Sequence, residues 1–137
     1  MDSVKLTLTA LTMSLLALSA EAETITIVAK QQEKFTSTSA HKGDTVIVRL
    51  PCNPTTGYSW KAQSERGESS YLSIGEMSFE RKSNPNGMVG VGGVCEFRTE
   101  VIGAEQKETI QFFYMRPWEA IQQNQSPQYE VEVTMKE

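Results

Sequence analysis

Hydrophobic and polar residues alternate with a period of two along most of this chain beyond residue 23. Alternation of this kind, with β-branched and aromatic residues at the apolar positions, is typical of strands that bury one face. The last segment shows it most clearly, with four apolar residues on one face and four polar residues on the other. These are Tyr129, Val131, Val133 and Met135 facing inward, and Glu130, Glu132, Thr134 and Lys136 facing outward.

The pattern predicts short strands at residues 24–28, 45–50, 58–63, 71–79, 94–102, 108–115 and 128–135. About seven such strands in one domain predict an all-β fold, an immunoglobulin-like β-sandwich. We expect Trp60 to fill the centre of its core. If successive strands alternate in direction, the connections at 51–57, 80–93 and 116–127 leave the sandwich at the same end. The connections at the opposite end consist of ordinary turn residues.

The first of these three connections contains Asn53, Pro54, Thr55, Thr56 and Gly57. Proline fixes its own φ and drives the preceding residue toward extended geometry, while glycine accepts backbone angles that other residues resist. The two threonines add β-branched stiffness and hydroxyls that can bond the local backbone. A loop with few conformations suits binding. The plain alternative is a connecting turn.

The second connection ends in Gly90, Val91, Gly92 and Gly93. These glycines lead into a strand, whereas a phosphate-binding loop opens a helix, so we do not expect a nucleotide site. The connection is also long for a simple hairpin. Clustered glycines therefore indicate close approach of bare backbone to another surface.

The third connection begins with Arg116, Pro117 and Trp118. A tryptophan next to an arginine at the start of a loop resembles a binding anchor, and this is the interpretation we favour over a buried aromatic. Arg116 could instead hold the loop in place.

The N-terminal residues 1–22 are predicted to be a signal peptide, followed by a single domain at 23–137. Lys5 precedes an apolar run that polar residues interrupt, and Ala20-Glu21-Ala22 fits a cleavage site after Ala22. We therefore expect an exported protein, periplasmic or secreted, with no membrane span after cleavage. In such a protein Cys52 and Cys95 are expected to form a disulfide, the alternative being two buried thiols.

Charge and chemistry exclude several classes of function. The net charge is −4, and no cluster of Lys or Arg suggests binding to nucleic acid. The chain has one histidine, His41, and too few ligands for a zinc site. His41 and Cys52 would lie at opposite ends of a strand roughly 15–20 Å long, so they cannot form a catalytic pair. We predict no enzyme, no metal and no cofactor.

Taken together, the segments NPTTGYSW, VGVGG and YMRPW resemble the chagasin family of cysteine peptidase inhibitors. The resemblance implies a reversible inhibitor whose partner is a papain-like cysteine peptidase. It implies that residues 53–57 block the catalytic centre while 90–93 and 116–118 contact the flanks of the cleft. We expect a monomer that binds one peptidase. An exported adhesion or carbohydrate-binding module that uses the same edge is the alternative.

Overall fold

A computed structural model describes residues 21–81 and 92–137 of the chain. In these ranges it contains nine strands and two short 3-10 turns, which confirms the all-β prediction. The strands are β1 (Thr24–Val28), β2 (Phe35–His41), β3 (Thr45–Cys52), β4 (Ser59–Ser64), β5 (Leu72–Ile74), β6 (Ser78–Arg81), β7 (Gly93–Val101), β8 (Gln106–Met115) and β9 (Tyr129–Lys136). The turns are η1 (Pro54–Thr56) and η2 (Gly67–Ser69). No helix in 21–81 or 92–137 is long and apolar enough to cross a membrane.

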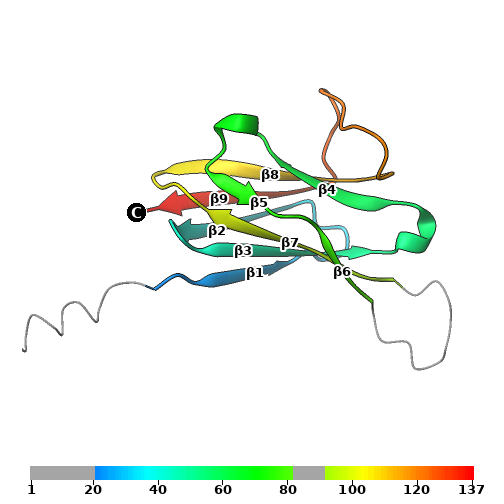
Figure 1. The fold of residues 1–137 in the computed structure, drawn as a ribbon, viewed down its shortest axis with the longest axis horizontal. Helices are drawn as coiled ribbons and strands as arrows, with labels where there is room; N and C mark the ends of the chain where they lie inside the picture. Colours follow the sequence, from blue (N-terminus) through cyan, green and yellow to red (C-terminus); the bar gives the residue numbers. More distant parts are fainter. Residues whose placement is uncertain (1–20, 82–91) are drawn as a thin grey trace, which may run out of the picture.

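The strands form two sheets packed face to face (Figure 1). One has the order β1-β3-β7-β5, with β6 also paired to β7, and the other has the order β2-β9-β8-β4. Most neighbours are antiparallel, but β1 runs parallel to β3 and β2 runs parallel to β9. The strands that carry the two cysteines, β3 and β7, are antiparallel neighbours.

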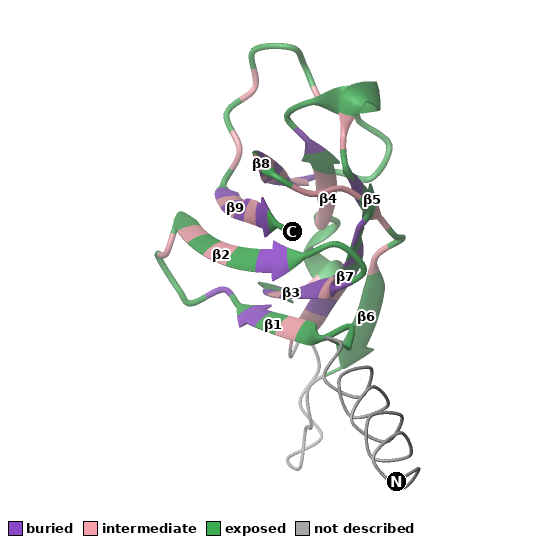
Figure 2. Cartoon of the chain, turned by 90° about the vertical axis from the view of Figure 1, so that its left-hand side faces the viewer, coloured by how far each residue is buried: buried purple, intermediate pink, exposed green. Residues whose placement is uncertain are grey.

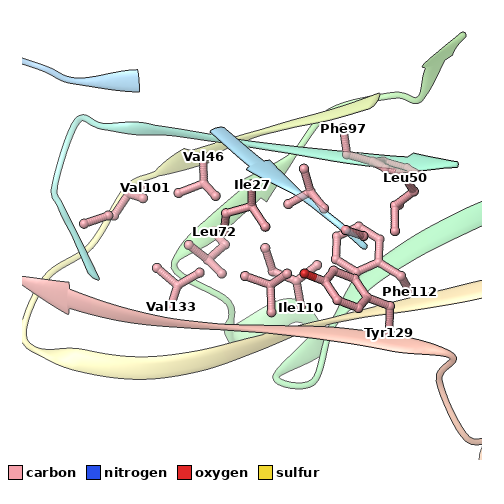
Figure 3. Close-up of a cluster of buried hydrophobic side chains, with 14 of the residues drawn as sticks. Ile27, Val46, Leu50, Leu72, Phe97, Val101, Ile110, Phe112, Tyr129 and Val133 are labelled. Atoms are coloured by element: carbon pink, nitrogen blue, oxygen red, sulfur yellow. The ribbon is translucent and has the colours of Figure 1, made fainter. Parts of the chain in front are cut away.

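The core lies between the sheets, where the alternating apolar residues of both meet (Figure 3). Phe97 from one sheet packs edge to face on Phe112 from the other, with ring centroids 5.4 Å apart. Burying one such side chain contributes roughly 1.5–3 kcal/mol relative to exposure. The inward residues of β9 are all buried, as the alternation predicts. They are Tyr129, Val131, Val133 and Met135.

Two strand predictions were wrong. The sequence pattern missed β2 because its Ser- and Thr-rich sequence offers only one buried residue, Ala40, and most of the strand is exposed (Figure 2). The single strand expected at 71–79 is two strands, β5 and β6, with Gly75 between them. A Cβ at Gly75 would lie 3.0 Å from the Arg98 carbonyl oxygen, so the chain passes β7 closely where it leaves the ladder.

Trp60 does not fill the centre of the core. It is the second residue of β4 and lies near the end of the sandwich, where it is half-buried against the edge of the core. Its indole Nε1 donates to the Pro51 carbonyl oxygen at 2.9 Å, and its ring lies 4.9 Å from that of Tyr114. Its position at the strand end, rather than mid-strand, explains the difference.

The pairing register confirms that the three unusual connections start from one end. Cys52 at the end of β3 is opposite Gly93 at the start of β7, and Gly93 is also opposite Arg81 at the end of β6. Ser59 at the start of β4 is opposite Met115 at the end of β8. Because β2 reverses the chain between β1 and β3, the connection at 29–34 lies at this end too, which the sequence did not predict. We call this the loop end (right in Figure 1).

Two buried carboxyl groups organise the opposite end, which we call the turn end. Asp44 Oδ1 accepts the Glu23 N–H at 2.9 Å and Oδ2 accepts the His41 N–H at 2.8 Å. Glu108, fully buried in β8, accepts hydrogen bonds from the Ser64 and Ser70 hydroxyls and from the Tyr71 N–H. These contacts hold the turns that the sequence presents as ordinary.

Candidate functional site

The loop at 53–57 is closed by its own side chains. Asn53 Oδ1 accepts from the Thr55 N–H at 3.2 Å and from the Thr55 hydroxyl at 2.6 Å. The Thr56 hydroxyl donates to the Asn53 carbonyl oxygen at 2.8 Å, and the Gly57 N–H donates to the Pro54 carbonyl oxygen at 3.0 Å. Gly57 has φ 82°, a left-handed conformation that favours glycine. The loop is therefore stiff for the reasons the sequence suggested, and residues 54–57 are exposed.

A disulfide joins Cys52 to Cys95 at the base of this loop, with the Cα atoms 5.9 Å apart. This confirms the predicted bridge. The disulfide lies at the loop end of the core, and both of its cysteines are buried. The bridge ties the chain just before residue 53 to the strand that follows residue 92.

Gly92 and Gly93 pack against the protein itself. A Cβ on Gly92 would lie 2.8 Å from the Cys52 carbonyl oxygen, and one on Gly93 would lie 2.1 Å from the Glu80 carbonyl oxygen. These close contacts are with the protein's own backbone, and the predicted approach of the glycines to another surface stays a prediction. Gly93 is buried, so internal packing alone accounts for a glycine there. Gly90 and Val91 fall outside the described residues.

Residues 116–118 form an exposed turn directly after β8. Trp118 is 76% exposed, the largest exposure among the large hydrophobic residues of the described chain. The Arg116 guanidinium lies 5.5 Å from the centroid of the Tyr58 ring, which continues from the 53–57 loop. Arg116 thus holds two loops together, the second of the two roles considered for it.

The 53–57 loop and the 116–118 turn share one supporting cluster. The Tyr58 and Tyr114 rings lie 5.6 Å apart, and the Tyr114 hydroxyl is 3.5 Å from the Asn53 nitrogen. Lys61 Nζ donates to the Glu119 carbonyl oxygen from the strand that follows Tyr58. The roles of Tyr114 and Lys61 in this cluster were not predicted from the sequence. The sequence feature that could have indicated this cluster is the set of aromatic residues at alternating strand positions, Tyr58 and Trp60 in one strand and Tyr114 in another.

A cleft of about 510 Å³ lies beside this cluster, between the 29–34 connection, Pro51, Trp60 and residues 126–129. Its floor includes Tyr129, whose hydroxyl donates to Thr36 Oγ1 at 2.7 Å, and burial raises the pKa of Tyr129. The Lys30 N–H lowers the pKa of Glu33 at its rim. The 21–81 and 92–137 ranges hold no group of three His, Cys, Asp or Glu residues that could bind a metal ion.

The fold and this edge define a class of protein, a β-sandwich that presents stiff, exposed loops at one end for binding. The family model of the chagasin family of peptidase inhibitors, I42, matches residues 39–133. The chain belongs to this family. It is therefore a peptidase inhibitor and not an enzyme, as the three motifs indicated.

Two named relatives agree with this assignment. Chagasin of Trypanosoma cruzi is 35% identical over 78 residues, which cover 56% of this chain and 68% of chagasin. Amoebiasin-2 of Entamoeba histolytica is 29% identical over 76 residues, 56% of this chain, and the match spans 58% of Amoebiasin-2.

Solved structures show the same fold. The cysteine protease inhibitor EhICP2 of Entamoeba histolytica superposes with a TM-score of 0.65 at 20% identity, covering 86% of this chain and all of EhICP2. PbICP-C, in a complex with falcipain-2, superposes with a TM-score of 0.53 at 13% identity, over 84% of this chain and 98% of PbICP-C. At these identities the likeness concerns the fold alone.

Proposed function

We propose that this protein is a reversible inhibitor of papain-like cysteine peptidases that fills the active-site cleft with loops from one end of its sandwich. The observation that carries the proposal is the stiff 53–57 loop, exposed at the tip and linked at its base to the 116–118 turn. The family membership and the inhibitors named among its relatives support the peptidase class.

The central loop is suited to block a thiolate without being cleaved. A peptidase attacks a carbonyl carbon only when it is held in a near-attack geometry about 3–3.5 Å from the nucleophile. The 3-10 turn at 54–56 curls the backbone, and its hydrogen bonds keep it from extending along the cleft as a substrate does. Because the loop is already ordered, little conformational entropy is lost on binding.

The flanking segments supply the contact area. Trp118, with most of its surface exposed, is the proposed anchor on one side of the cleft. Gly90, Val91 and Gly92 are proposed to contact the other side, with the backbone after them fixed by the disulfide. An interface of standard size buries about 800 Å² per partner.

Export is part of this proposal. Residues 1–22 are proposed to be a signal peptide and 23–137 the mature inhibitor, acting as a monomer in the periplasm or outside the cell. A disulfide between Cys52 and Cys95 supports this location, because such bonds persist in oxidising compartments.

Inhibition of papain and two related peptidases by the purified protein tests the function. We expect tight, reversible inhibition in a one-to-one complex. Trp118→Ala should raise the inhibition constant about 10–100-fold, as for a typical interface anchor, without lowering the melting temperature. Ile102→Ala is the matched control, since Ile102 is an exposed hydrophobic residue (52%) at the turn end and should leave inhibition unchanged.

An unchanged inhibition constant for Trp118→Ala would remove Trp118 from the proposed interface. Absence of inhibition at micromolar excess over all three peptidases, combined with binding to glycans, would favour the adhesion or carbohydrate-binding alternative.

A further inference from the structure

The backbone of Glu23 is held on both sides at the turn end. Its N–H donates to Asp44 Oδ1 at 2.9 Å, and its carbonyl oxygen accepts the Thr45 N–H at 2.9 Å. Asp44 is 3% exposed, so its carboxyl group is a buried acceptor, with Oδ1 bound to the Glu23 nitrogen and Oδ2 to the His41 nitrogen. The strand β1 begins at the next residue, Thr24.

The same nitrogen belongs to the bond that signal cleavage would break. Water would hydrolyse the Ala22–Glu23 peptide bond in the active site of a signal peptidase. Ala22 would leave as a carboxylate with the signal peptide, and the Glu23 nitrogen would become an α-ammonium group. The Glu23 nitrogen, which now faces Asp44 as an amide, would then face it as a positively charged ammonium group.

We propose that Asp44 is a binding site for the α-ammonium group of the processed chain, which anchors β1 to the turn between β2 and β3 once residues 1–22 are removed. This inference rests on the proposed export. It places the cleaved bond, Ala22–Glu23, and the carboxylate that binds the new N-terminus in the same molecule.

Charge makes the contact stronger and selective for one cleavage position. The Asp44 carboxylate already accepts a charge-assisted hydrogen bond from the amide, and an α-ammonium donor adds the attraction between two opposite charges. Each additional residue before Glu23 would move the charge by about 3.3–3.6 Å. Cleavage after Ala20 would therefore leave the ammonium group about 7 Å farther along the chain, outside hydrogen-bond reach of Asp44.

The neighbouring ionisable groups are few. His41 Nδ1 lies 3.7 Å from Asp44 Oδ2, and Lys42 is exposed in the same turn. Glu100 of β7 is opposite Thr45, and Glu23 carries its own exposed carboxyl group. Among these, the His41 side chain is the basic group closest to Asp44, so a His41→Gln variant separates its contribution from that of the amine.

The sign of the pH effect follows from the pairing. An α-amino group has an ordinary pKa of about 7.7–8.0, and binding to a carboxylate raises the pKa in the folded state. Its stabilisation is then complete below about pH 7.7 and is lost as the pH rises through the raised pKa of the folded protein.

The first experiment locates the cleavage. The full chain is expressed in a bacterial host with an intact export pathway, and the intact mass of the exported protein is measured. We expect a chain that begins at Glu23. A chain that begins at any other residue, or that keeps residues 1–22, overturns the proposal.

The second experiment is a thermodynamic cycle on the processed protein. Chains that begin at Glu23, or at one additional glycine before it, are compared with Asp44 intact and with Asp44→Asn. At pH 6 the glycine should lower the melting temperature by about 3–6 °C for a domain of this size when Asp44 is present. The difference should vanish in Asp44→Asn and at pH 10, and should persist in His41→Gln.

A glycine effect of equal size with and without Asp44 would overturn the proposal. So would the absence of any effect at pH 6. Inhibition of papain at 25 °C should be equal in all four proteins, since the turn end is far from the proposed interface. Loss of the amine site and failure of the proposed function are therefore distinguishable.

Discussion

The loop end and the turn end of this sandwich are held together by different means. At the loop end, the tips at 54–57 and Trp118 are exposed, and the links lie below them: a disulfide, two tyrosine rings and one arginine. At the turn end, the carboxyl groups of Asp44 and Glu108 are buried and bind the backbone of the turns directly. A surface that must bind a partner keeps its tips unoccupied, so its stiffness has to come from its base.

Removal of the disulfide should cause the largest loss of stability. The bond closes a loop with a sequence separation of 43 residues, for which the chain-entropy model gives roughly 3–4 kcal/mol. A Cys52→Ala/Cys95→Ala protein should lose about that much in urea unfolding and should inhibit papain more weakly, because the loop base is no longer fixed. Reductant should have the same effect on the wild type and none on the variant. An unchanged urea midpoint in both tests would contradict the assigned role.

Glu108→Ala should be nearly as damaging to stability and should spare inhibition. It leaves the Ser64 hydroxyl and the Tyr71 N–H without their acceptor, while the Ser70 hydroxyl keeps the Leu72 carbonyl oxygen. The expected cost is about 3 kcal/mol. Urea unfolding measures the loss, and the inhibition constant should stay constant while the protein is folded. Glu76→Ala, at an exposed residue, is the control. Weaker inhibition by fully folded Glu108→Ala would mean that the turn end affects binding at the loop end.

Acid should weaken the turn end through Asp44. The Glu23 and His41 N–H groups lower the pKa of Asp44 below the ordinary value of about 3.9. A lowered folded-state pKa contributes stability above the unfolded-state value, and that stability is lost as the pH falls through the folded-state pKa. Asp44→Asn should lower the free energy of unfolding by about 2 kcal/mol at pH 7. Below pH 4, the free energy of unfolding of the variant should depend less on pH than that of the wild type. If the free energy of unfolding falls by the same amount in wild type and variant between pH 7 and 2.5, this prediction is wrong.

The Arg116–Tyr58 contact should have the smallest effect, and on inhibition alone. Cation–π contacts at exposed sites contribute about 0.5–1 kcal/mol, so Arg116→Ala should raise the inhibition constant roughly two- to fivefold. Tyr58→Phe keeps an aromatic face and should be close to wild type. Arg66→Ala removes the corresponding contact with Tyr71 at the turn end, at 5.9 Å, and serves as the matched control. Equal effects of Arg116→Ala and Arg66→Ala on inhibition would refute the loop-end role.

The sequence predicted most of the sandwich and the order of its loops, but not every strand. Segments such as 129–136 alternate clearly because one face is fully buried. The edge strand β2 buries little, so its sequence carries almost no pattern. Trp60 is a large apolar residue of the kind that fills cores, but its depth in the sandwich depends on where β4 begins relative to β8.

The sequence by itself determined which residues face inward, where the chain turns, and that residues 53–57 have few conformations. Proline, glycine and alternation act over a few neighbouring residues, so they can be read locally. The tertiary structure decided that Arg116 meets Tyr58, that Tyr114 reaches Asn53 from 61 residues away, and that Glu108 binds Ser64 from 44 residues away. Such contacts depend on the register and packing of distant strands, which no local pattern specifies.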